Sequence, residues 1–454
     1  MAAEEPSMAT SKTFKPWEVD QTCLFPPSVR DFVAADHLAS LVRDLVRNEL
    51  DLSAIHDRYS ELRGFPPYHP TMMTALLLYA LCRGVYSSRR IEASCEERVD
   101  FMAVTGMATP DHSTICKFRN DHQQALSELF LQVLSLCRQA GLVKLGHVAL
   151  DGTKVQANAS KHSAMSYKRM KEAEPELAAK VEEWMEQAQA VDEAEDAEHG
   201  PGNRGDTIPS HIQAKIRKLA KIREAKARLE QEAAEEAAKV AQDREQREQE
   251  TGRRMSGRAP KALAGVPEDK AQTNFTDPES RIMKTAKGFE QCYNAGAAVD
   301  AGHQVIVATT LSNKQNDHDD LVVLVDQTIS NTGETPRQVS ADAGYCSERN
   351  LEALEQRGIE GFVATGRQKH GTSSPTKSAT PKGERTKAMA KKLKEQGFDS
   401  PYRLRKHTVE PVFGQIKECR GLRRFLHRGI EKVTAEWTLL CTAHNVLKLV
   451  GARG

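Results

Sequence analysis

A break in composition near the middle of the chain most constrains its fold. From about residue 160 to residue 271 the chain is rich in Ala, Glu, Lys, Gln and Arg and has few aromatic side chains. Apolar residues recur there at an approximate heptad spacing, which is typical of packed helices: Ile212, Ile216, Leu219, Ile222, Leu229 and Val240. We therefore predict a helical insertion over residues 161–270, a hairpin or coiled coil with its tip at residues 200–206. A single solvated helix is the alternative.

Strand patterning occurs on both sides of this insertion. A short apolar run begins at His147, and the turn-forming pair Asp151-Gly152 is expected at the exit of that strand. After residue 271 the sequence predicts, in order, a β-hairpin turning at residues 300–302, a helix, a strand ending at Asp342, a helix and a further strand. This order predicts an α/β core with a mixed sheet flanked by helices, built from residues 146–160 and 271–454. Residues 366–400 are expected to form a mobile basic loop.

The N-terminal third is predicted to be all-α. Residues 1–35 read as an irregular arm with prolines, whereas apolar residues recur at helical spacing over residues 36–145. The segment PDHSTICKFR offers Asp111 or Ser113 as the N-cap of a helix. The short helices here resemble a helix-turn-helix in outline. A DNA contact and plain packing remain equally supported for this region.

Charge is distributed unevenly along the chain. The net charge is only +1, yet residues 366–432 contain 18 Lys and Arg against 6 Asp and Glu. Residues 171–199 have the opposite bias, with 11 acidic residues and 2 basic ones. This polarity indicates one region that faces nucleic acid and one solvated acidic region.

Cysteine spacing and hydropathy exclude several classes of protein. The nine cysteines have no CxxC spacing, so neither a zinc ribbon nor a disulfide framework is indicated. No apolar run approaches the length of a membrane span, and the N-terminus lacks a signal-peptide pattern. We expect an intracellular protein without a membrane partner.

Three separated acids are candidates for a metal site: Asp151, Asp342 and Glu410. Cleavage or transfer of a phosphodiester needs an activated oxygen nucleophile and a stabilised leaving oxygen. Two Mg²⁺ ions about 3.5–4 Å apart supply both, and such ions prefer carboxylate ligands. Each acid alone could be an ordinary turn or surface residue. Their joint position beside a basic tract favours a shared site.

The segment around Glu410 reads as a helix. Glu410, Phe413, Gly414 and Lys417 have the i, i+3, i+4, i+7 spacing of one helical face. Pro411 follows Glu410, and proline is tolerated in the first turn of a helix. We therefore predict that the helix begins near Thr408 as its N-cap. A basic helical face that contacts the DNA backbone is predicted further along, at Arg420, Arg423, Arg424 and Arg428.

Several segments together resemble the bacterial insertion-sequence transposases of the DDE type: ALDGTKVQANAS, NFTDPESRIM with YNAGAAVD, SADAGYCS, and VEPVFGQIKECRGLRRFLHRG. PDHSTICKFR resembles the N-terminal domain of these enzymes and TAHNVLKL their final helix. The resemblance covers most of the chain outside the insertion and the extreme N-terminus.

This resemblance implies a ribonuclease H-like core in which Asp151, Asp342 and Glu410 form the catalytic, metal-binding triad. The metal would be Mg²⁺, with Mn²⁺ as an alternative. The family also has a Y-R-E-K signature that grips the DNA strand. By spacing, Tyr402 matches its tyrosine and Lys417 its lysine. Arg405 and Lys406 both remain candidates for the arginine position, because Arg405 lies one residue further from Glu410 than usual.

The implied activity is transposition: cleavage at the ends of a mobile element, followed by joining of the 3′-hydroxyl to target DNA. The expected partners are double-stranded DNA, as terminal inverted repeats and target, and a second copy of the chain on DNA. The expected location is the bacterial cytoplasm, in association with the nucleoid. Two alternatives remain open: a structure-selective nuclease on the same core, and a DNA-binding regulator or domesticated transposase without catalysis.

Overall fold

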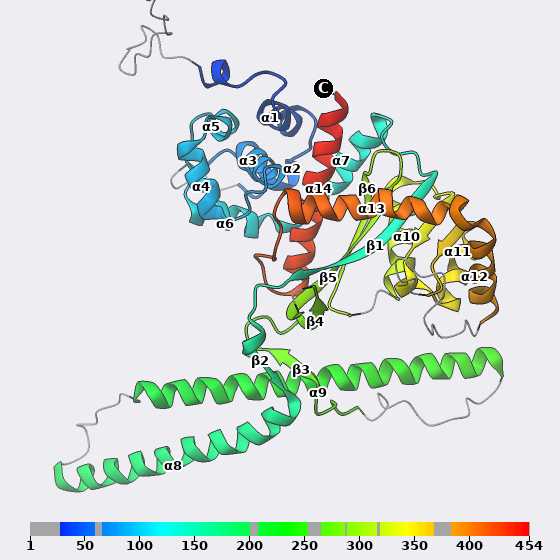
Figure 1. Ribbon diagram of the computed structural model, residues 1–454. Helices are drawn as coiled ribbons and strands as arrows, with labels where there is room; N and C mark the ends of the chain where they lie inside the picture. Colours follow the sequence, from blue (N-terminus) through cyan, green and yellow to red (C-terminus); the bar gives the residue numbers. More distant parts are fainter. Residues whose placement is uncertain are drawn as a thin grey trace, which may run out of the picture.

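A computed structural model describes residues 28–59, 66–199, 208–252, 265–286, 288–315, 318–366 and 383–453. Its fold places a helical N-terminal region against a sheet with helices around it, and a long helical insertion projects below the sheet (Figure 1). None of the helices in these ranges is long and apolar enough to cross a membrane.

The N-terminal region consists of helices packed around α3 (Pro70–Cys82). Pro70 occupies the first turn, where no backbone hydrogen bond is lost, and the helix is buried along nearly its whole length. Asp111 is the N-cap of α6, since its carboxylate accepts from the backbone N–H of Ser113 and Thr114. The other elements are η1 (Val29–Phe32), α1 (Leu38–Asn48), α2 (Ser53–His56), α4 (Ser88–Glu97), α5 (Val99–Thr105), α6 (His112–Asp121) and α7 (Gln123–Gln139).

A six-stranded mixed sheet lies at the centre of the molecule, in the order β4-β5-β1-β7-β8, with β6 also pairing with β5. β5 pairs antiparallel with β1, β4 and β6, whereas β7 and β8 continue the sheet parallel to β1. The predicted hairpin at residues 300–302 is confirmed as β5–β6. The strands are β1 (His147–Gln156), β4 (Arg281–Thr285), β5 (Gly288–Asp300), β6 (Ile306–Ser312), β7 (Gln338–Ala341) and β8 (Glu360–Val363).

Helices cover the sheet and join it to the N-terminal region. The indole Nε1 of Trp437 on α14 donates to the carbonyl of Gly296 on β5 at 3.0 Å, and α14 also packs on α7 and α3. One apolar core therefore runs from the N-terminal helices into the sheet. The helices are α10 (Asp320–Thr332), α11 (Glu348–Gln356), α12 (Glu384–Gln396), α13 (Leu404–Gly414) and α14 (Ile430–Arg453).

The prediction of a basic loop over residues 366–400 is wrong for its second half. Residues 367–382 lie outside the described residues, but Glu384–Gln396 form the helix α12. Ion pairs hold this helix against its neighbours: Arg385 with Glu352 and Glu355 of α11, and Lys392 with Glu360. The Lys392 ammonium also lies 4.0 Å from the centre of the Phe362 ring. These partners stabilise a helix where composition alone suggested a loop.

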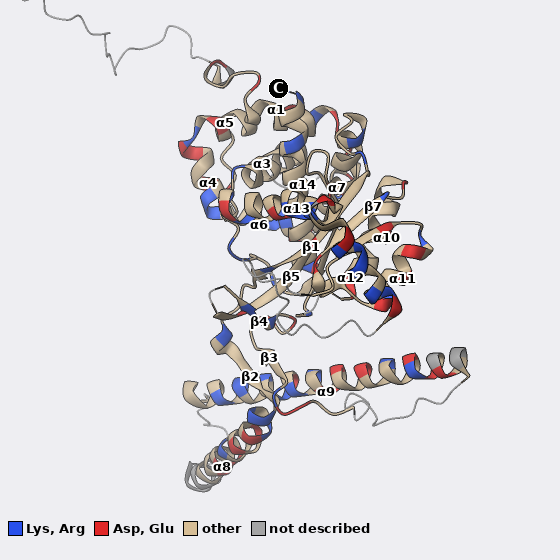
Figure 2. Cartoon of the chain, turned by 45° about the vertical axis from the view of Figure 1, so that its right-hand side comes forward, with Lys and Arg blue, Asp and Glu red and all other residues tan. Residues whose placement is uncertain are grey.

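The insertion contains two helices, α8 (Tyr167–His199) and α9 (Ser210–Thr251), which leave the core through the short paired strands β2 (Ala164–Ser166) and β3 (Gln272–Asn274). They share a small apolar core of their own that includes Tyr167, Met170 and Ile222. The expected tip at residues 200–206 lies outside the described residues. Figure 2 shows charged residues along the length of α9, with Lys and Arg prominent on its first half.

Candidate active site

Asp151 and Asp342 lie at the same level of two neighbouring parallel strands. The last paired residues of β1 and β7 are Ala149 and Ser340, and each aspartate lies two residues beyond that pair. Residues in register on adjacent parallel strands point to the same face of a sheet. The sheet thus brings together two acids that are far apart in sequence.

The expectation that Asp151 marks the exit of its strand is wrong. β1 continues to Gln156 because the long strand β5 accompanies it as far as the pair Gln156–Cys292. Only the parallel pairing with β7 stops before Asp151. Asp342, in contrast, directly follows the end of β7, and its Oδ1 accepts from the backbone N–H of Gly344 at 2.8 Å.

Glu410 lies on helix α13, and Arg405 of the same helix links its carboxylate to that of Asp151. The guanidinium donates from Nη1 to Asp151 Oδ2 at 2.7 Å and from Nη2 to Glu410 Oε1 at 2.9 Å. The side chain of Arg405 is only 11% exposed, and that of Asp151 is 16% exposed. Because a guanidinium is a rigid planar fork, the two carboxylates lie within the width of one such group.

Burial makes Asp151 an unusual acid. Burial is the main cause that raises the pKa of Asp151 from 3.8 to about 7. The nearby Asp342 and Glu410 contribute to this rise, and Arg405 opposes it. The Arg405 guanidinium therefore lowers the pKa of Asp151 by less than burial of the carboxylate raises it. Such a carboxylate gains most from an additional cation.

The prediction that the helix begins at Thr408 is wrong. Thr408 is buried inside α13, which begins at Leu404 after a 3-10 turn over Pro401–Arg403. Pro411 therefore lies in the helix interior, where it cannot donate to the carbonyl of His407 four residues earlier. The side-chain amide of Gln304 donates to that carbonyl instead, at 2.9 Å, so the helix is maintained.

The residues of the Y-R-E-K pattern occupy different surroundings. Arg405 points to the acids, and its Cζ lies 5.9 Å from the centre of the half-buried Tyr402 ring, whereas Lys406 is exposed. Lys417 lies in a π-helical turn over Gln415–Cys419 and donates to Thr153 Oγ1 at 2.9 Å and to the carbonyl of Lys154 at 3.1 Å. Lys417 thus holds the part of β1 that follows Asp151.

The predicted basic helical face beyond Lys417 is wrong. Gly421, in the left-handed region at φ +74°, follows the end of the helix, and the segment after it runs beside the end of β1. Arg423 pairs with Glu418, and Arg428 donates to the carbonyl of Asn158. Arg424 pairs through its backbone with Gln156, and Arg420 turns inward, with Nη2 3.3 Å from His444 Nδ1.

Arg405 between two acids and Gln304 beside Pro411 are arrangements that sequence reasoning missed. A proline inside a helical pattern signals that a carbonyl needs another donor, but the donor lies about a hundred residues away. Within the described ranges, no group of three or more His, Cys, Asp or Glu side chains has a ready metal-binding arrangement.

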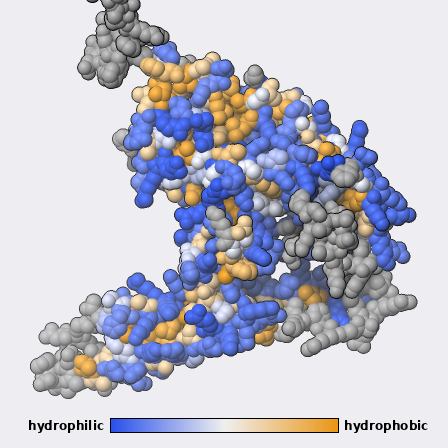
Figure 3. All heavy atoms as spheres, viewed as in Figure 1, coloured by the Kyte–Doolittle hydropathy of each residue, from blue (hydrophilic) through white to orange (hydrophobic). Residues whose placement is uncertain are grey.

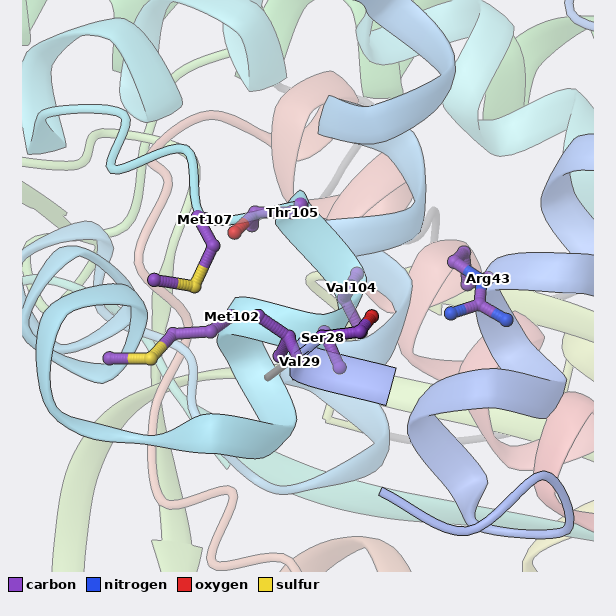
Figure 4. Close-up of a pocket in the computed structure, with 9 residues that line it drawn as sticks. Ser28, Val29, Arg43, Met102, Val104, Thr105 and Met107 are labelled. Atoms are coloured by element: carbon purple, nitrogen blue, oxygen red, sulfur yellow. The ribbon is translucent and has the colours of Figure 1, made fainter. Parts of the chain in front are cut away.

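Two surface hollows lie in the N-terminal region. One, of about 370 Å³, is lined by Ser28 and Val29, by Arg43 of α1, and by residues 102–107 at the end of α5 and just after it (Figure 4). Apolar side chains also gather on this part of the surface (Figure 3). The other hollow, of about 640 Å³, lies between the start of α4 and one face of α6.

Two family models match the chain. "Transposase domain (DUF772)" matches residues 27–121, and "Transposase DDE domain" matches residues 263–446. The second match includes Asp342 and Glu410, whereas Asp151 lies between the two matched segments. No curated protein and no solved structure matches the chain.

The two matches, in this order along one chain, identify it as an insertion-sequence transposase of the DDE type. This class is of the polynucleotidyl transferase and nuclease type, acts on DNA, and has a ribonuclease H-like core. The mixed sheet with helices around it is consistent with that core.

Proposed function

We propose that this chain cleaves the ends of a mobile element and joins the freed 3′-hydroxyl to target DNA. The observation that carries the proposal is the alignment of Asp151 with Asp342 on parallel strands, together with the guanidinium that ties Glu410 to Asp151. In the proposed site, an acid of β1, an acid that directly follows β7 and an acid of α13 act together.

The donor set fits Mg²⁺, with Mn²⁺ as an alternative. Asp151, Asp342 and Glu410 offer only hard oxygen atoms, and Arg405 is a cation that already occupies the space between two of them. The bound ions would activate the attacking oxygen and stabilise the leaving oxygen. The three carboxylates would hold these ions.

The signature residues would orient the DNA strand. Arg405 and Tyr402 lie at the acids, and the exposed Lys406 is on the same helix. Lys417 fixes β1 beside the reacting phosphate. We propose that Arg423 and Arg424, in the segment after the π-helical turn, contact the DNA backbone. Arg420 turns inward toward His444, and we propose that it holds this segment in place.

A second copy of the chain would be present, since transposition joins two element ends. We propose a homodimer on DNA that binds the terminal inverted repeats, with the N-terminal helices contributing to this contact. Size-exclusion chromatography with light scattering tests the dimer: the mass should double when end DNA is added. Complexes that contain a single chain at all protein and DNA concentrations would contradict it.

The catalytic proposal is tested by cleavage of end-labelled element DNA in Mg²⁺. Wild type should cut at the element end, and Asp342→Asn should lose about 10³-fold or more of the rate, as expected when a metal ligand is removed. Asp326→Asn, which removes a similar charge paired with Arg357 on the outer face of α10, is the matched control. Equal rates for wild type and Asp342→Asn would refute the assignment.

The same assay separates the alternatives. Cleavage without joining of the 3′-hydroxyl to target DNA would indicate the nuclease. Binding to the inverted repeats that survives chelation, with no product in any divalent ion, would indicate the regulator without catalysis.

A further inference from the structure

The interior position of Pro411 leaves a gap in the hydrogen bonding of α13. In an α-helix the N–H of residue 411 would donate to the carbonyl of His407, and proline has no such N–H. The gap lies in the turn that joins Arg405 to Glu410, the two residues of this helix at the acid site. Without another donor, that turn would be the weakest part of the helix.

Gln304 fills this gap from a different part of the fold. It lies in the turn between β5 and β6, and its Nε2 donates to the His407 carbonyl at 2.9 Å. Gln304 has a φ of +60°, an uncommon conformation for a residue other than glycine. The turn therefore directs this side chain at α13.

The side chain and backbone of Gln304 are themselves held by α14. Its Oε1 accepts from Lys448 Nζ at 2.9 Å, and its backbone carbonyl accepts from His444 Nε2 at 2.9 Å. Burial lowers the pKa of His444 to about 3, so the ring is neutral and has one N–H, which it gives to Gln304. The Nδ1 of the same ring is then free to accept from Arg420.

We propose that Gln304 is a positioning residue for the acid site, because it replaces the hydrogen bond that Pro411 removes and so fixes the turn carrying Arg405 and Glu410. This inference depends on the proposed function for its effect on cleavage, but not for its effect on the helix. Gln304 contacts none of the three acids. It acts through its bond to α13, and its Oε1 also accepts from Gln415 Nε2 at 3.4 Å, in the turn that follows this helix.

The test combines removal of the donor with restoration of the missing N–H. Gln304→Ala removes the side-chain amide, and Pro411→Ala supplies a backbone N–H to the His407 carbonyl. Hydrogen–deuterium exchange should become faster over residues 404–414 in Gln304→Ala and should return close to the wild-type rate in the double variant. This readout does not require that the chain cleave DNA.

Cleavage should follow the same pattern. Gln304→Ala should lower the single-turnover rate roughly 10- to 100-fold, the loss expected from a small misplacement of a catalytic group, while the affinity for end DNA stays unchanged. The double variant should recover most of the rate. Asn331→Ala is the matched control, since Asn331 also donates a side-chain amide to a core carbonyl, that of Val307 at 2.9 Å, but away from α13.

Two outcomes would overturn the inference: exchange over residues 404–414 that is unchanged in Gln304→Ala, or exchange in the double variant that stays as fast as in the single one. A wild-type protein that fails to cleave DNA, with the exchange pattern as expected, would count against the proposed function and leave the role of Gln304 supported.

Discussion

At the residue scale, the acids of the site differ in their access to water. The side chain of Asp151 is 16% exposed, whereas that of Glu410 is 46% exposed. Asp151 lies on an interior strand of the sheet, and Glu410 lies on α13. Burial therefore disfavours the charged form of Asp151.

The raised pKa of Asp151 predicts a pH dependence of stability. The folded chain holds the Asp151 proton more tightly than the unfolded chain does. The contribution of this group to the free energy of unfolding is therefore fully present below about pH 4. This contribution is lost as the pH rises through about 7. Between pH 5 and pH 8, the free energy of unfolding of wild type should fall relative to Asp151→Asn by at most about 3 kcal/mol.

Urea denaturation of the two proteins at both pH values, in the presence of a chelator, measures this difference. An identical pH dependence in wild type and Asp151→Asn would show that Asp151 ionises as readily in the folded chain as in the unfolded one.

Arg405 and a divalent cation would compete for the same carboxylates. Arg405→Gln removes the positive charge that now neutralises Asp151 and Glu410, so Ca²⁺, used as an unreactive ion, should bind several-fold more tightly to this variant than to wild type. Isothermal titration calorimetry measures the affinity. Lys406→Gln, on the same helix but exposed, should bind as wild type does, and weaker binding by Arg405→Gln would contradict the competition.

At the element scale, an aromatic pair is one of the contacts that hold α13 against the core, beside the buried Val409 and Val412. The Phe413 ring stacks on Trp437 at 6.3 Å between centroids and 24° between planes, and Phe413 is 7% exposed. Phe413→Ala should lower the free energy of unfolding by about 3–5 kcal/mol, the usual cost of removing a buried aromatic ring. Chemical denaturation measures this cost.

Leu404 at the start of the same helix is the control for this prediction, because it is 43% exposed. Leu404→Ala should change the free energy of unfolding by less than about 0.5 kcal/mol. Equal losses in the two variants would mean that α13 is not held through Phe413.

The elements that could be predicted from sequence are those with local signals. The β5–β6 hairpin is an apolar run broken by an Asp-Ala-Gly turn, and the strand before Asp342 is bounded in the same way. The length of β1 depends on β5 beside it, and α12 depends on ion pairs to α11 and β8. In the interior of α13, the carbonyl left without a donor by Pro411 is bonded by Gln304. Partners distant in sequence decide these features, so a local pattern does not reveal them.

The candidate site likewise contains residues that local sequence signals indicate and a contact that depends on distant partners. Asp342 could be selected from a strand ending and Glu410 from a basic tract. The selection of Asp151 depends on an expected strand exit that the structure does not have, and the position of Arg405 between Asp151 and Glu410 could not be predicted. Arg405 and Asp151 are 254 residues apart in the sequence. Only the sheet and α13 together bring these side chains into contact.

At the scale of the whole molecule, the helical insertion has a core of its own and joins the sheet through a narrow base. β2 and β3 pair up to Ser166 and Gln272, which are close enough for a two-residue turn. Replacement of residues 167–271 by Asn-Gly should leave a folded protein, since the main apolar core does not include α8 or α9.

This shortened chain should melt cooperatively, within several degrees of the full chain. The ion pair between Arg281 of β4 and Glu232 of α9 is a contact that would be lost, and a partly exposed pair contributes at most about 1 kcal/mol. Thermal denaturation followed by circular dichroism measures the transition. A shortened chain without a cooperative transition would show that the sheet needs the insertion to fold.

The most direct test of the account is a change of ligand type at Asp342. A cysteine thiolate is softer than a carboxylate and binds Mn²⁺ better than Mg²⁺. Asp342→Cys should therefore cleave element-end DNA poorly in Mg²⁺ and regain activity in Mn²⁺, while Asp326→Cys should behave as wild type in both ions. Cleavage by Asp342→Cys at the wild-type rate in Mg²⁺ would contradict a metal-binding role for Asp342 and, with it, the three-acid site.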